Sequence, residues 1–287
     1  MTAERYDDAY LPGRFVPSVR PFLDEYARRS AWARRELVWR PVCYGPDPGE
    51  RLHVFPAPAP GAPLVVFVHG GYWQELSELE SSFAARDVLA AGAAYAAVGY
   101  GLAPRLRLGE IVTQVRRAVL SLCRDASTLN ADPERVVLVG HSAGAQLVCM
   151  SLVGPLPDHL TPRDLACAVV LISGLYELAP LRRSSIGAAI ELTAADVAAY
   201  SPVRHLHGGL PPLLLARAAD EPAGFGYQQR RLAEAAVRVG VPVTELVVGG
   251  HNHFDLPLGL ADPTDPLGRA VLELVRPLVP LSEKGIA

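Results

Sequence analysis

Short apolar runs recur along the chain between residues 64 and 248, and each ends at a glycine or a polar turn. Helical segments separate them at about 77–91 and 108–126 and from Ser142 onward. Apolar runs that alternate with helices indicate βαβ units, so the pattern predicts an α/β fold with a mostly parallel sheet and helices on both faces. The predicted strands are residues 64–68, 93–98, 135–139, 166–172, 213–215 and 243–248.

The N-terminal part, residues 1–60, follows a different pattern. It predicts a helix at about 18–35 and a hairpin with strands at about 36–44 and 50–55. The proline-rich stretch 56–63 then predicts an exposed connection, because proline lacks the N–H group that a central strand needs.

A second irregular segment, at about 175–210, interrupts the βαβ rhythm. It is too long for a simple connection, so we interpret it as a small cap or lid over the site. The chain has 287 residues, of which 50% are hydrophobic. Because α/β enzymes of this size often fold as one unit, we expect a single domain over residues 1–287.

The charge balance and the cysteines restrict the class of protein. Charged residues make up 20% of the chain and the formal net charge is −3. No basic excess is available to neutralise phosphates, which argues against nucleic-acid binding. The chain shows no apolar run of about 18 residues and no secretory signal, so we expect a cytoplasmic protein with no membrane partner. The four widely spaced cysteines are typical of reduced thiols. For the oligomeric state, a homodimer is one alternative.

The strongest chemical signal is the sequence Gly-His-Ser-Ala-Gly at residues 140–144. It follows an apolar run and opens a helical segment, which is the context of a nucleophile elbow. The turn between strand and helix is so tight that the residues around the serine must be small. The motif therefore predicts Ser142 as a nucleophile, with a glycine-rich packing turn as the structural alternative.

A second glycine-rich turn, His-Gly-Gly-Tyr-Trp at residues 69–73, also ends an apolar run. An acyl-transfer enzyme needs backbone N–H donors that are already aimed at the developing oxyanion, and glycines let a loop bring them close. We expect Gly71 and Tyr72 to supply such donors, together with Ala143, the residue after the nucleophile. Trp73 either lines an aromatic pocket or belongs to the core.

A serine nucleophile needs a histidine base and an acid that orients it, in the chain order Ser, Asp/Glu, His. His251 and His253 both follow the last apolar run, and spacing alone does not choose between them. Asp220 lies just past the apolar run at 213–215 and is the predicted acid. Its neighbour Glu221 is the alternative, because either side chain could turn inward.

A metal site has to be weighed against this mechanism. His205 with His207, and His251 with His253, have the H-x-H spacing that metal-dependent amide hydrolases use. The first pair lies in a predicted loop, and no acidic cluster accompanies either pair. We therefore favour a serine mechanism with no metal and no cofactor.

Together these motifs resemble the α/β-hydrolase superfamily, and within it the kynurenine formamidase (arylformamidase) group related to hormone-sensitive-lipase-like esterases. The resemblance covers roughly residues 60–260. It is most specific where tyrosine and tryptophan follow the paired glycines of the loop. The matching segments are residues 69–74, 100–104, 140–147 and 173–178, Ser201-Pro202, Phe225 with Gln228, and residues 253–255.

The resemblance implies an α/β-hydrolase fold and a triad of Ser142, Asp220 and His253, and so chooses His253 over His251. It implies hydrolysis of a small aryl formamide or ester, with N-formylkynurenine as the expected small-molecule substrate. Tyr72, Trp73 and Gln146 are the candidate substrate contacts. Gln146 stands where relatives often have histidine, and the chain is one residue longer than the family pattern after Asp220.

Two other functions remain at this point. A site that stabilises an oxyanion also stabilises an enolate, so a biosynthetic enzyme of natural-product metabolism could use it for cyclisation, C–C bond formation or acyl transfer. The second alternative function is that of a non-catalytic binding protein with the same fold. The complete set of triad residues argues against the latter.

Overall fold

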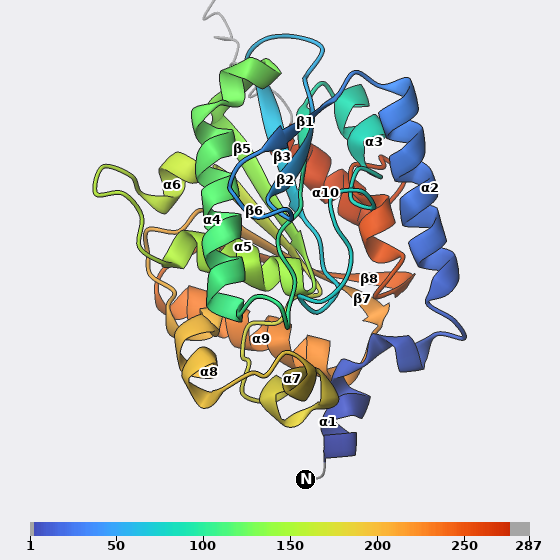
Figure 1. The fold of residues 1–287 in the computed structure, drawn as a ribbon, viewed down its shortest axis with the longest axis vertical. Coiled ribbons are helices and arrows are strands. Elements are labelled where there is room, and N and C mark those ends of the chain that lie inside the picture. Colours follow the sequence, from blue (N-terminus) through green and yellow to red (C-terminus); the bar gives the residue numbers. More distant parts are fainter. Residues whose placement is uncertain (1–2, 276–287) are drawn as a thin grey trace, which may run out of the picture.

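An eight-stranded sheet forms the centre of the computed structural model, which describes residues 3–275 (Figure 1). Its strands are β1 (Arg40–Cys43), β2 (Arg51–Phe55), β3 (Ala62–Val68), β4 (Ala94–Val98), β5 (Ala131–His141), β6 (Ala168–Ile172), β7 (Leu213–Asp220) and β8 (Val243–Asn252). Their order in the sheet is β1-β2-β4-β3-β5-β6-β7-β8. The pairs β1–β2 and β2–β4 are antiparallel, and every pair from β4 to β8 is parallel. The predicted α/β fold and hairpin are therefore confirmed.

Strands β3, β4 and β6 are buried at every position because both faces of the sheet are covered. Every residue of β3 is buried. Leu64, Val66 and Val68 contact one core, whereas Val65 and Phe67 contact the core on the opposite face. Successive strand residues point to opposite faces, so a strand with two buried faces must be apolar at every position. Each such side chain contributes about 1.5–3 kcal/mol by leaving water.

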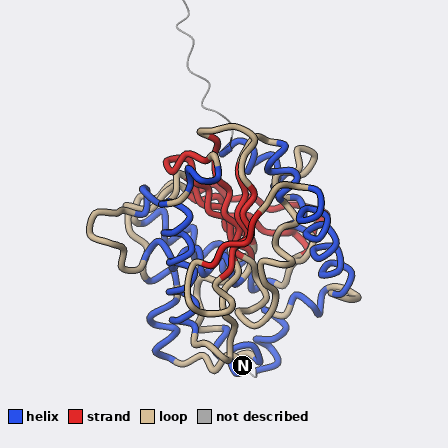
Figure 2. The backbone as a smooth tube through the Cα atoms, turned by 45° about the horizontal axis from the view of Figure 1, so that its top comes forward, coloured by secondary structure: helices blue, strands red, loops and turns tan. Residues whose placement is uncertain are grey.

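Helices pack on both faces of this sheet (Figures 1 and 2). Residues of α4, α5 and α9 belong to one core, and residues of α2, α3 and α10 belong to the other. The helices are α1 (Ala3–Tyr10), α2 (Arg20–Glu36), α3 (Ala85–Ala90), α4 (Leu108–Arg124), α5 (Ala143–Val153), α6 (Pro162–Leu165), α7 (Ser185–Ala189), α8 (Ala194–Tyr200), α9 (Ala223–Arg238) and α10 (Pro266–Val275). None of these described helices is both long and apolar enough to cross a membrane.

The predicted helix at 77–91 is wrong over most of its length, because only α3 is helical there. Serine side chains compete with the helix for backbone groups. The hydroxyl of Ser77 accepts a hydrogen bond from the N–H of Leu79 at 3.1 Å. The hydroxyl of Ser81 donates to the carbonyl of Ser77. These local bonds hold the segment in turns until α3 begins.

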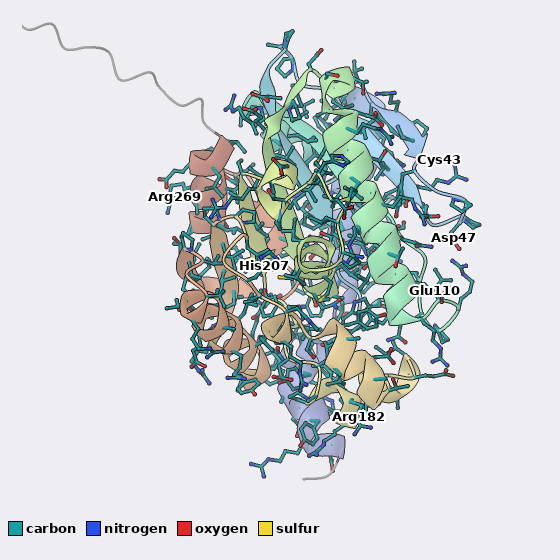
Figure 3. The ribbon with its side chains drawn as sticks, turned by 90° about the vertical axis from the view of Figure 1, so that its left-hand side faces the viewer. Cys43, Asp47, Glu110, Arg182, His207 and Arg269 are labelled. Carbon is teal, nitrogen blue, oxygen red and sulfur yellow. The ribbon has the colours of Figure 1, made fainter. Side chains whose placement is uncertain are left out.

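The predicted cap, 175–210, contains two short helices, α7 and α8, and two single turns. The N-terminal helix α1 packs against α7 and α9 and so joins the cap. Asp7 of α1 accepts a hydrogen bond from the N–H of Ser185 at 2.7 Å, and Arg183 donates to the hydroxyl of Tyr6 at 2.9 Å. Figure 3 shows the neighbouring Arg182 at this end of the molecule. The sequence pattern did not predict α1 or its place in the cap.

All four cysteines are free. Cys123 and Cys149 are buried, whereas Cys43 and Cys167 are exposed. Cys43 lies on β1, in the N-terminal hairpin (Figure 3).

Candidate active site

Ser142 lies in a strained turn between β5 and α5. Its backbone has φ 54° and ψ −118°, a conformation that a non-glycine residue rarely adopts. Its N–H donates to the carbonyl of Ile172 on the neighbouring strand at 2.8 Å. The turn is therefore held by the sheet, and it lies at the carboxyl end of a central strand.

The two glycines of the motif are required because the helix packs directly on the strands. A Cβ atom at Gly140 would lie 2.6 Å from the backbone nitrogen of Ala145. A Cβ atom at Gly144 would collide with the carbonyl oxygens of Val68 and His69. The Gly-x-Ser-x-Gly sequence thus has a steric cause in this fold, and it is the same cause that gives a nucleophile elbow its small residues.

The ends of β7 and β8 bring a carboxylate and an imidazole together. The Nδ1 atom of His253 lies 3.1 Å from Oε1 of Glu221, and both side chains are buried, at 4% and 0% exposure. Each residue directly follows its strand, and the two strands pair in parallel up to Asp220 and Asn252. A second donor, the hydroxyl of Ser173, bonds to the same oxygen of Glu221.

The predicted acid, Asp220, is therefore corrected to its alternative, Glu221. Asp220 is the last residue of β7 and is exposed to solvent. The register of β7 against β8 shifts between Ala218 and Asp220. Ala218 pairs with Val248 and Asp220 with Asn252, so two extra residues of β8 lie between these pairs. The carboxylate that contacts His253 at the end of β7 is that of Glu221, whose side chain is fully buried.

Ser142 and His253 line one pocket of about 360 Å³, together with Gly71 and Tyr72. Much of its wall comes from the N-terminal segment that follows α1, which contributes apolar side chains. These include Leu11, Pro12, Val19, Leu23 and Tyr26. Ile186 of the cap lines the same pocket. The sequence pattern predicts a cap near the site, but it does not predict the contribution of the N-terminal segment.

His141, which precedes the serine, also lines this pocket and was not among the predicted site residues. Its Nε2 atom lies 3.0 Å from the carbonyl oxygen of His253. Burial, with a smaller contribution from the neighbouring His253, holds the pKa of His141 well below its usual value. A neutral imidazole that donates through Nε2 thus supports the backbone of His253. Its position inside the Gly-His-Ser motif was the available signal.

The predicted oxyanion loop adopts an unusual backbone. Gly71, Tyr72 and Trp73 have φ values of 91°, 50° and 62°. A Cβ atom at Gly71 would collide with the carbonyl oxygen of Glu75, so only glycine fits there. In the described part of the chain, the N–H groups of Gly71 and Tyr72 donate no hydrogen bond. The N–H of Ala143, at the first position of α5, has no partner within its helix.

Two stacked aromatic rings support the start of this loop. The rings of His69 and Tyr100 lie 4.1 Å apart at an angle of 9°. The hydroxyl of Tyr100 donates to the carbonyl of His69 at 2.9 Å. Burial lowers the pKa of His69 to about 4, so its ring is neutral near pH 7.

Of the three predicted substrate contacts, only Tyr72 lines the pocket. Trp73 and Gln146 are fully buried in the core. The indole N–H of Trp73 donates to Oε1 of Gln146 at 3.0 Å, and the amide of Gln146 donates to the carbonyl of Tyr200 at 2.9 Å. Trp73 therefore belongs to the core, which was the alternative interpretation of this residue, and Gln146 is its hydrogen-bond partner.

The two H-x-H pairs have other partners. Nε2 of His205 lies 3.0 Å from the carbonyl oxygen of Ala198, in a loop. His251 lies between two carboxylates, 3.2 Å from Asp255 and 3.0 Å from Asp265. Within residues 3–275, no group of three or more His, Cys, Asp or Glu side chains has the arrangement of a metal site.

Comparison with known proteins finds kynurenine formamidases at 30% identity or more over most of the chain. A family model described as BD-FAE matches residues 54–157. The kynurenine formamidase of Danio rerio is 31% identical over 291 residues, which cover 96% of this chain and 97% of the relative. The kynurenine formamidase of Salmo salar is 30% identical and covers 82% of this chain and 81% of its own length.

Solved structures agree on the fold. A protein from Silicibacter sp. TM1040, provisionally assigned as a thioesterase, superposes with a TM-score of 0.81 at 28% identity, covering 94% of this chain and 98% of its own. A thermostable carboxylesterase cloned from a metagenomic library has a TM-score of 0.68 at 20% identity, covering 91% and 98%. At that identity the second likeness concerns the fold alone.

Proposed function

Because this chain belongs to the kynurenine formamidase family of α/β-hydrolases, we propose that it hydrolyses a small aryl formamide or ester of the N-formylkynurenine type. The chain is an enzyme of the α/β-hydrolase class. The substrate and the roles of the individual residues are the proposal. Its main support is the buried contact between His253 and Glu221 beside the strained Ser142.

In this mechanism Glu221 orients His253 and stabilises its charged form. A carboxylate can only accept, so Nδ1 of the imidazole donates to it and Nε2 of the neutral ring is left to accept a proton. His253 takes the proton of Ser142 as the hydroxyl attacks the carbonyl carbon. The developing oxyanion is bound by the N–H groups of Gly71, Tyr72 and Ala143.

The tetrahedral intermediate then collapses. The carbon–nitrogen bond of the formamide breaks, and His253 returns its proton to the leaving arylamine. Water attacks the remaining formyl-Ser142 ester with the same base, which releases formate and restores the serine. No group changes oxidation state in these reaction steps, and no cofactor takes part in them.

The test measures kcat/KM for N-formylkynurenine and for a simple aryl acetate, with the Ser142→Ala protein as the control. We expect both substrates to be hydrolysed, and Ser142→Ala to lose at least about a thousandfold of the rate because the covalent route is lost. A fluorophosphonate probe should label Ser142.

A value below about 10² M⁻¹s⁻¹ for N-formylkynurenine, well under ordinary enzyme efficiencies, would reject the formamidase assignment. If Ser142 were still labelled by the probe, the serine site would stand, and biosynthetic acyl transfer or cyclisation would become the leading function. An active Ser142→Ala protein would reject the serine mechanism itself.

A further inference from the structure

The pocket around Ser142 has apolar walls that carry two opposite charges. Among the described residues that line it, Arg14 and Glu75 are the only arginine, lysine, aspartate or glutamate. We propose that Arg14 and Glu75 bind the carboxylate and the ammonium group of an α-amino-acid head on the substrate. This inference rests on the proposed function and names the residues that would select a zwitterionic substrate.

Arg14 comes from the N-terminal segment, in the single turn η1 (Pro12–Phe15). Its guanidinium bonds to the carboxylate of Asp8 and lies 4.0 Å from Asp7. Asp7 is already held by the N–H of Ser185. A guanidinium has five N–H donors in a planar fork, so these contacts leave donors for a further carboxylate. Because the side chain is 47% exposed, an incoming carboxylate can reach it from solvent.

Glu75 comes from the loop that carries the predicted oxyanion donors. Its backbone N–H donates to the carbonyl of Gly71 at 3.0 Å, which ties its position to that of the loop. The residue is exposed, and its carboxylate has no hydrogen bond or ion pair within the described chain. A carboxylate in this state is an acceptor for the three N–H donors of a primary ammonium group.

The remaining wall explains why both charges matter. Side chains such as Leu11, Val19 and Leu23 offer only apolar contacts, which suit an aryl or alkyl group. A neutral ligand would leave the Glu75 carboxylate without a partner in the protein or the ligand and would not use the remaining donors of Arg14. A zwitterion would contact both side chains at once, which is a pair of contacts that neither a neutral nor a singly charged ligand can make.

The experiment compares O-acetyl-L-tyrosine with 4-methylphenyl acetate, two aryl acetates of which only the first carries the amino-acid head. The readout is the ratio of their kcat/KM values within one protein, so any loss of folded enzyme cancels. We expect Arg14→Gln and Glu75→Gln each to lower this ratio by about tenfold, as expected for a partly exposed charged hydrogen bond. The loss should appear mainly in KM, and Arg14→Lys should restore part of it.

Matched controls are Arg20→Gln and Glu36→Gln. These residues form exposed pairs with Asp24 and Arg35 outside this pocket, so the ratio should stay at its wild-type value. Protection of Ser142 from fluorophosphonate by tyrosine, compared with 4-methylphenol, gives the same comparison without turnover.

Unchanged ratios in both pocket variants, or equal losses in the controls, would overturn the inference. Because the substrate pair consists of esters, failure to hydrolyse N-formylkynurenine would reject the formamidase assignment without deciding this test. Conversely, the protein could hydrolyse N-formylkynurenine while the ratio of kcat/KM values stays the same in the Arg14 and Glu75 variants. That result would leave the proposed function standing and reject this inference.

Discussion

Replacing Glu221 tests the correction that the structure makes to the predicted triad. We expect Glu221→Gln to lower kcat by about 10²–10⁴-fold and Asp220→Asn to change it by about twofold at most. Glutamine has the shape of glutamate and can still accept from the hydroxyl of Ser173, so the packing around His253 is retained. What is lost is the negative charge 3.1 Å from Nδ1 of the base.

The magnitude follows from burial. Glu221 is fully buried and His253 nearly so, so the imidazolium that forms in the transition state has little water to stabilise it. Removing one partner of a buried ion pair costs about 3–5 kcal/mol. Each 1.36 kcal/mol is about a factor of ten in rate, which gives the stated range. Because Asp220 is exposed, its change should stay within about 0.5 kcal/mol.

The assay is steady-state hydrolysis of an aryl acetate by both variants, with the melting temperature of each as the folding control. The charge on His253 arises only during reaction, so kcat and kcat/KM should fall together while KM stays the same. A Glu221→Gln protein that keeps more than about a tenth of the activity would refute the buried-pair reasoning. An inactive Asp220→Asn protein would restore the original prediction.

Three further predictions use the other histidines and the question of metal. His253→Ala should be almost inactive and His251→Ala should keep a substantial fraction of the activity, because His251 contacts two carboxylates and not Glu221; the reverse result in an ester assay would exchange their roles. Extensive treatment with EDTA and dipicolinate should leave turnover unchanged, whereas chelator-sensitive turnover with stoichiometric metal by elemental analysis would overturn the serine mechanism. Burial lowers the pKa of both His53 and His69 to about 4, so between about pH 6.5 and pH 4 only the unfolded chain binds these protons. The free energy of unfolding should therefore fall as the pH falls through this window. We expect a loss of about 2 kcal/mol per histidine between pH 7 and pH 5, measured by urea unfolding. A His53→Gln protein should show a smaller loss, and a flat wild-type profile would contradict the burial argument.

The layered fold could be predicted from local patterns because burial constrains composition directly. A strand covered on both faces must be apolar at every position, and β3 and β4 show this over their whole lengths. The elbow at Ser142 was also visible, since its small neighbours are required wherever a helix packs this closely on a strand. The turns at 71–84 were missed because serine hydroxyls replace helical hydrogen bonds there, and hydrophobic spacing does not report such bonds.

The identity of the acid depended on tertiary structure. Asp220 and Glu221 are adjacent carboxylates at the end of the same strand, and only the packing around His253 determines which of them contacts the imidazole. The wall of the pocket depended on it as well. Arg14 is distant from Ser142 in sequence, and docking of the N-terminal segment on the cap brings it to the pocket. Periodicity records whether a residue is buried, whereas the partner of a buried or pocket-lining side chain is chosen by long-range packing.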